Sequence, residues 1–229
     1  MADNPARIGP LLREYWTDDA REVFAYFGEP DAWENGSRTN TQMVFANHPK
    51  LGMAFNTFGK HLLIDSTLPV RPRELIVLRV AYLLKSEYEW HYHVGYGLAA
   101  GLTLTEIAAV RDGPEAPEWA TRDGDRAVLA AVDELWTQSR ITDGTWADLD
   151  RNFDRHQLMD LVFTIGQYVM LSWAISSFGI QLEDGVDRIG FDLETQSGRR
   201  PGSTYRPREG DNWTTRSGLD STPAAGTSS

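Results

Sequence analysis

The chain has 229 residues, and its 41% hydrophobic content with eight tryptophans is enough to build one well-packed core. Its 33 acidic and 22 basic residues give a formal net charge of −11, which argues against nucleic acid as a partner because no excess of cations is available to neutralise phosphates. The sequence contains no cysteine, so disulfide exchange and thiol chemistry by the chain itself are excluded. The first residues lack a continuous apolar run, so we expect no signal peptide, no membrane span and a cytoplasmic location.

The N-terminal part predicts short helices. Residues 1–34 read as an arm followed by one helix, with Thr17 or Asp18 as its cap. Two further helices are expected over residues 41–47 and 51–63, separated at Pro49.

Residues 71–101 predict the central pair of helices. Ser86 begins the second helix, and Glu89 follows three residues later at the spacing of a capping box, in which each side chain bonds the backbone of the other residue. Gly101 is the expected left-handed residue that ends this helix. The first helix carries a broad apolar face made of Leu75, Ile76, Leu78, Val80, Leu83 and Leu84.

The rest of the chain continues with helical patterns. Thr103 and Glu106 form another capping-box spacing, residues 123–138 predict an amphipathic helix, and an apolar helix is expected over residues 156–178, ending at Gly179. Because no stretch alternates with the period of a strand, the expected fold class is all-α. Residues 188–229 are rich in Gly, Ser, Thr and Pro, and we predict an irregular tail that is partly disordered or docks on a neighbouring subunit.

Three ionisable side chains stand out in the central pair. Glu89 and His93 are four residues apart, about 40° around one helix, so their side chains share a face. Glu74 lies early in the preceding apolar helix, and a hairpin of the two helices would bring all three together. Two carboxylates and an imidazole in an apolar setting can move protons, because burial and mutual charge shift their pKa values toward neutrality.

Each of these residues also has a structural interpretation. Glu89 can be a helix cap, Glu74 can form an ion pair with a nearby arginine, and His93 can be a buried histidine without catalytic function. A facial metal site made of the three is a minor alternative, and we predict no metal and no cofactor. His91 lies roughly 200° from His93 around the helix, so these two histidines cannot chelate one ion.

The central spacing resembles that of a known family. Glu74, Ser86, Glu89 and His93 occur in the order and spacing of the helical hairpin of the carboxymuconolactone decarboxylase family, which includes the AhpD-like alkylhydroperoxidases. Similar stretches are NHPKL at 47–51, STLPVRPRELIVLRVA at 66–81, YEWHYHV at 88–94 and AGLTLTEIAAVRDGP at 100–114. The resemblance covers roughly residues 35–185 and implies an AhpD-like helical domain over residues 35–187 that assembles as a trimer or hexamer.

The chain departs from the peroxidase branch of that family at the positions that carry its chemistry. That branch has cysteines where this chain has Ser86 and Glu89, so the resemblance points to the decarboxylase side, which is thought to work by acid–base chemistry without a cofactor. We therefore predict a decarboxylase or lyase acting on a small organic acid or lactone. An isomerase or eliminating lyase using the same residues is one alternative, and a noncatalytic oligomeric binding module is another.

The predicted site has two parts. His93, Glu89 and Glu74 are the expected catalytic residues. The residues expected to bind substrate are Ser86, Tyr92, Tyr96 and His48, where Ser86 would add a hydroxyl and the tyrosines would donate to a carboxylate or carbonyl. His48 matches the family pattern, and its alternative role is to terminate a helix.

Overall fold

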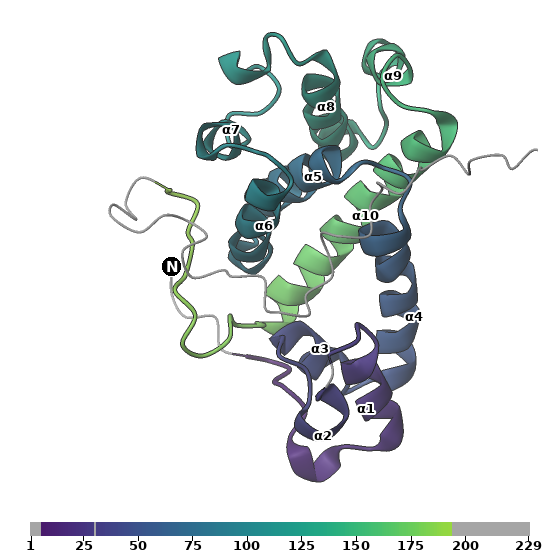
Figure 1. Cartoon of the computed structure of the whole chain (residues 1–229), viewed down its shortest axis with the longest axis vertical. Helices are drawn as coiled ribbons and strands as arrows, with labels where there is room; N and C mark the ends of the chain where they lie inside the picture. Colours follow the sequence, from purple (N-terminus) through teal and green to yellow (C-terminus); the bar gives the residue numbers. More distant parts are fainter. Residues whose placement is uncertain (1–5, 30, 194–229) are drawn as a thin grey trace, which may run out of the picture.

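A computed structural model describes residues 6–29 and 31–193, and within these ranges the chain is all-helical, as predicted (Figure 1). Turns of 3-10 helix lie at Arg13–Tyr15 and Pro117–Trp119, and a π-helical turn at His61–Asp65. The α-helices are α1 (Asp18–Ala25), α2 (Ala32–Asn35), α3 (Asn40–Phe45), α4 (Pro49–Lys60), α5 (Val70–Leu83), α6 (Glu87–Ala99), α7 (Leu104–Ala109), α8 (Asp123–Gln138), α9 (Asp143–Asp150) and α10 (Arg155–Phe178).

Helices α5, α6 and α10 form the centre of the molecule (Figure 1). α5 packs against α6, α8 and α10 at once, and every residue from Pro72 to Ala81 is buried. A helix that is covered on all sides cannot be amphipathic, which explains why its polar residues must find partners inside the protein. The predicted central hairpin is therefore confirmed as the core of the fold.

Two groups of helices cover the ends of this core. Helices α7, α8 and α9 lie at one end, and α1 to α4 lie at the other (Figure 1). The second group has a small apolar core of its own around Val23 and Phe24. Between the two groups, α4, α6 and α10 leave room for a cavity whose position is described below.

The ends of the central helices correct one prediction. Ser86 makes no side-chain capping bond, so the capping box between Ser86 and Glu89 is wrong, and the chain enters α6 through Lys85 at a positive φ of 57°. Gly101 has φ of 86° after α6, and Thr103 with Glu106 forms the predicted capping box of α7. Glu89 is consequently free of the helix end and faces the interior.

The segment after α10 returns to α6. Trp90 donates a hydrogen bond from its indole nitrogen to the carbonyl of Gly190 at 2.8 Å, and the backbone nitrogen of Ile189 donates to His91 Nδ1 at 3.0 Å. The ring of Phe191 lies 5.4 Å from that of Trp90. The first residues of the predicted tail therefore pack on their own domain, while residues 194–229 lie outside the described part of the chain.

By length and composition alone, α10 could cross a membrane, although no other helix in the described residues qualifies. Half of its most apolar window is buried inside the fold. Such burial is typical of the core helix of a globular domain, and here α10 packs against α5 and borders the cavity.

Candidate active site

The candidate site is built around His93 on α6. His93 Nδ1 lies 2.6 Å from Glu74 Oε2 on α5, and both side chains are buried. Burial alone raises the pKa of Glu74, but the attraction of His93 and Arg73 outweighs it and holds the pKa below its ordinary value. Glu74 is therefore ionised at neutral pH, and its Oε2 accepts a hydrogen bond from the protonated Nδ1 of His93.

Arg73 balances the buried charge of Glu74. Its Nε donates to Glu74 Oε1 at 3.0 Å, and another nitrogen of the guanidinium donates to the carbonyl of Leu63 at 2.5 Å. Both oxygens of Glu74 are thus engaged, one by Arg73 and one by His93. Because Glu74 is completely enclosed, it can orient the imidazole but cannot touch a substrate.

Glu89 lies on the opposite side of the imidazole. Its Oε2 is 3.5 Å from His93 Nε2, one helical turn away on α6. The pKa of Glu89 is raised to about 7. Burial is the main cause, the repulsion of Glu74 adds to it, and the attraction of His93 partly offsets it. Near neutral pH this carboxyl group can therefore either hold or release a proton.

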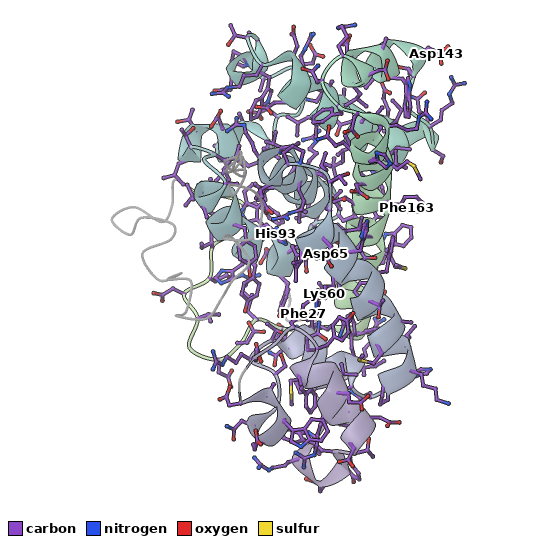
Figure 2. The ribbon with its side chains drawn as sticks, turned by 45° about the vertical axis from the view of Figure 1, so that its right-hand side comes forward. Phe27, Lys60, Asp65, His93, Asp143 and Phe163 are labelled. Carbon is purple, nitrogen blue, oxygen red and sulfur yellow. The ribbon has the colours of Figure 1, made fainter. Side chains whose placement is uncertain are left out.

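A cavity of about 180 Å³ opens beside Glu89 and His93. Its walls come from α3, α4, α6, α10, the segment between α1 and α3, and the π-helical turn after α4. Figure 2 shows His93 from α6 in the middle of the molecule, with Phe27 from the N-terminal part below it. The aromatic wall consists of Phe27, Phe45, Phe55, Tyr88, Tyr92, Tyr96 and Tyr168, and the uncharged polar wall of Ser37, Thr39, Thr41, Gln42, Asn56 and Gln167.

Two tyrosines fix the plane of the imidazole. The rings of Tyr96 and Tyr168 each lie 5.1 Å from the ring of His93, at interplanar angles of 73° and 88°. Such edge-to-face contacts restrict rotation of the imidazole. Burial, with the charges of Glu74 and Glu89, raises the pKa of Tyr168 well above its ordinary value, so its phenol stays neutral.

Glu183 accepts hydrogen bonds from two tyrosines of the cavity wall and from the start of α3. Its carboxylate accepts from the hydroxyl of Tyr88 at 2.7 Å, from the hydroxyl of Tyr92, and from the backbone nitrogen of Asn40 at 2.6 Å. Tyr92 does line the cavity with its ring, as predicted, but its hydroxyl points to Glu183 rather than toward a substrate. Tyr96 also lines the cavity, next to the imidazole.

The structure places two of the expected substrate-binding residues elsewhere. Ser86 is buried at the junction of α5 and α6 and lines a different cavity, because its position before the first residue of α6 directs its side chain away from His93. His48 is exposed and begins α4, where its Nδ1 accepts from the backbone nitrogen of Leu51 at 3.4 Å. It therefore caps the start of the next helix and does not terminate the preceding one.

Several residues of the cavity were not identified from the sequence. Gln167 and Tyr168 lie in the middle of the apolar helix α10. A polar amide in such a helix, at Gln167, was the signal in the sequence that could have pointed to a site there. Gln42 and Asn56 exchange two hydrogen bonds, at 2.6 and 3.2 Å, across α3 and α4. Their separation in sequence left no short-range pattern to detect.

The donor set does not favour a metal. Across residues 6–29 and 31–193, no group of three or more potential ligands is arranged to hold an ion. Both oxygens of Glu74 and one nitrogen of His93 are already used within the buried ion pairs. The arrangement is instead suited to proton transfer. The imidazole of His93 lies between the ionised carboxylate of Glu74 and the carboxyl group of Glu89, whose pKa is about 7.

Comparison with known proteins agrees with this fold. Residues 49–134 match the sequence profile described as the Carboxymuconolactone decarboxylase family. No curated protein sequence matches the chain. Solved structures with the same fold include an alkylhydroperoxidase AhpD core from Ralstonia eutropha, an uncharacterized peroxidase-related protein, with TM-score 0.64 and 17% identity over 79% of this chain and 94% of that one.

Two further structures extend the comparison. An AhpD-type protein of unknown function from Agrobacterium tumefaciens is 20% identical over 62% of this chain and 96% of its own, with TM-score 0.56. The debrominase Bmp8 is 14% identical over 77% of this chain and 92% of its own, with TM-score 0.60.

At these identities the likeness establishes the fold alone, which is the AhpD-like helical fold. Within the cysteine-free chain, residues 49–134 are similar to the carboxymuconolactone decarboxylase family, whose profile they match.

Proposed function

We propose that this protein is a cofactor-independent acid–base enzyme of the lyase or decarboxylase type, acting on a small organic acid or lactone. The observation that carries the proposal is the continuous contact from Glu74 through His93 to Glu89, which begins at a buried ionised carboxylate and ends in the cavity. The match of residues 49–134 to the family profile supports a catalytic role in general. A thiol peroxidase activity of the chain itself is excluded because it has no cysteine.

In the proposed mechanism, Glu74 holds the Nδ1 proton of His93 and leaves Nε2 as the base. Nε2 takes a proton from the carbon beside a substrate carbonyl, the C–H electron pair moves into the carbonyl, and an enolate forms. The imidazolium then returns this proton to a different carbon in an isomerisation, or to a departing group in an elimination. In a decarboxylation, the bond to the carboxylate carbon breaks, CO2 leaves, and an imidazolium at His93 protonates the resulting enolate.

Glu89 assists the proton transfers at His93 Nε2. Its neutral form can donate to the enolate oxygen or to Nε2, and its ionised form stabilises the imidazolium 3.5 Å away. A pKa of about 7 makes both forms available without a large energetic penalty.

A noncatalytic binding module is the second candidate. It is supported by the aromatic walls of the cavity, which would bind a small molecule without reaction, and by the loss of the cysteines that act in the peroxidase branch. In that case His93 would contribute to affinity and stability only.

The test is a comparison of wild type, His93→Ala and His156→Ala, an exposed histidine that serves as the matched control. Each is incubated with 4-carboxymuconolactone and related lactones, β-keto acids and unsaturated acids, while CO2, ultraviolet absorbance and deuterium incorporation from D2O are followed. We expect His93→Ala to lose about 10²- to 10⁴-fold in rate while remaining folded. Equal turnover by His93→Ala would refute the mechanism, and binding without turnover in every variant would favour the binding module.

A further inference from the structure

The charge of the cavity bears on the substrate. Among the described residues, no lysine or arginine lines the cavity, whereas two carboxyl groups, Glu29 and Glu89, do. Arg73 does not line the cavity, and its guanidinium donates to Glu74 and to the carbonyl of Leu63. Arg38, whose backbone nitrogen donates to Glu29, pairs through its side chain with Asp31 at 3.0 Å.

A carboxylate ligand would therefore meet no lysine or arginine among the described residues that line the cavity. Moving an ionised group from water into an apolar site is unfavourable by several kcal/mol unless a cation or several donors receive it. Among the buried charges already present, Arg73 balances Glu74, and Glu89 Oε2 lies 3.5 Å from His93 Nε2. An anion would add an uncompensated negative charge beside Glu89.

The dimensions and walls favour a planar ring. An apolar cavity of roughly 150 Å³ accommodates benzene in other proteins, and this one measures about 180 Å³. Rings from three directions face it, with Phe27, Phe55 and Tyr168 on the N-terminal segment, α4 and α10. Flat aromatic walls bind flat ligands by stacking and edge contacts.

One residue of the wall has a buried polar atom without a hydrogen-bond partner among the described residues. Gln167 is buried, and its side-chain oxygen accepts no hydrogen bond in the part of the chain that the structure describes. A buried acceptor without a donor is unfavourable by about 1–3 kcal/mol. The neighbouring amides of Gln42 and Asn56 satisfy each other, so Gln167 is the amide available to a ligand.

We propose that the cavity selects an uncharged, planar, single-ring compound that carries an O–H or N–H donor for Gln167, and discriminates against the carboxylate anion of the same size. The inference rests on the proposed function in that it concerns the same cavity, and it narrows the substrate from organic acids to neutral ring compounds such as hydroxylated lactones. It favours isomerisation or elimination over decarboxylation of a free acid.

The test measures binding rather than turnover. Isothermal titration calorimetry and ligand-observed NMR at pH 7.5 measure the affinity for two pairs of compounds of matched size. Benzamide and benzoate differ in charge, and phenol and toluene differ in the presence of an O–H donor. We expect wild type to bind the neutral amide about tenfold or more tightly than benzoate, and phenol more tightly than toluene. Gln167→Leu should remove the preference for phenol, and Thr39→Lys, which places a cation at the cavity wall, should raise the affinity for benzoate.

The outcomes separate this inference from the proposed function. Benzoate binding as tightly as benzamide, or no binding of any of the four compounds at millimolar concentration, would overturn the inference. If the preference for neutral rings holds in wild type and in His93→Ala while deuterium exchange never depends on His93, the inference stands and the catalytic proposal fails.

Discussion

Glu89 carries its proton at a pH where most glutamates have lost theirs. It is buried one turn from His93 and close to the ionised Glu74, and the pKa of its carboxyl group rises from the ordinary 4.5 to about 7. A raised pKa means that the folded state holds the proton more tightly than the unfolded chain. The stabilisation is present in full below pH 4.5 and is lost as the pH rises through about 7.

Glu89→Gln tests this linkage. Because glutamine cannot ionise, we expect the variant to be more stable than wild type at pH 8, by an amount on the order of 2–3 kcal/mol, and to differ little at pH 5. Urea unfolding at the two pH values measures the difference. The exposed carboxylate Glu22, changed to Gln, is the control; a stabilisation of Glu89→Gln that is independent of pH would contradict the shifted pKa.

Glu74→Gln tests the buried ion pair. The variant leaves the buried guanidinium of Arg73 without its counter-charge, so we expect the free energy of unfolding to fall by about 3–5 kcal/mol. Arg73→Met combined with Glu74→Gln removes both charges and should lose less than the single variant. Chemical denaturation compares the three proteins, and a loss below about 1 kcal/mol for Glu74→Gln would show that the pair is not coupled as described.

At the scale of elements, Arg79 on α5 forms hydrogen bonds to the end of α7 and to α8. Arg79 donates two hydrogen bonds to Asp133, at 2.7 and 2.8 Å, and two to the carbonyls of Val110 and Arg111. The guanidinium lies against Gly113, where a methyl group would meet Arg79 at 2.6 Å. Both the positive φ of 83° and this close approach require glycine.

Gly113→Ala should therefore destabilise more than Gly101→Ala. Both positions have positive φ, but a methyl group at Gly101 meets nothing within 4 Å. We expect Gly101→Ala to cost about 1 kcal/mol from backbone strain alone, and Gly113→Ala to cost roughly 1–3 kcal/mol more because Arg79 must move. Thermal or urea unfolding gives both values, and equal losses would mean that Arg79 yields without cost.

At the scale of the whole molecule, the outer face of α10 is apolar and is not covered by any of the residues that the structure describes. The side chains of Met159, Phe163, Met170 and Trp173 are exposed, and Figure 2 shows Phe163 on the outer side of the molecule. An exposed stripe of large apolar side chains usually contacts another protein surface. The family resemblance implies a trimer or hexamer, and this face is the surface we propose for it.

The assembly is tested by light scattering coupled to size-exclusion chromatography. We expect three or six times the chain mass of 25.7 kDa, and dissociation when Phe163 and Trp173 are both changed to Glu. Trp146→Glu on α9 is the control, because that tryptophan is exposed but lies on another helix. A monomeric wild type at micromolar concentration would refute the proposal.

The all-α class, the central hairpin and the meeting of Glu74, Glu89 and His93 follow from the sequence. They follow because helix period and residue spacing are local properties: four residues on one helix share a face whatever the rest of the chain does. Gly101 and the cap at Thr103 were predictable for the same reason. The family spacing supplied the pairing of the two helices.

Only the tertiary structure decided which side chains share the cavity. Ser86 and Glu89 are three residues apart, yet the turn before α6 sends Ser86 into another cavity, and Glu183 reaches Tyr88 and Tyr92 across more than 90 positions. The pKa of Glu89 and the unpaired side-chain oxygen of Gln167 likewise depend on burial in the folded structure. Burial and long-range contact are set by how all helices pack together, and no local pattern carries that information.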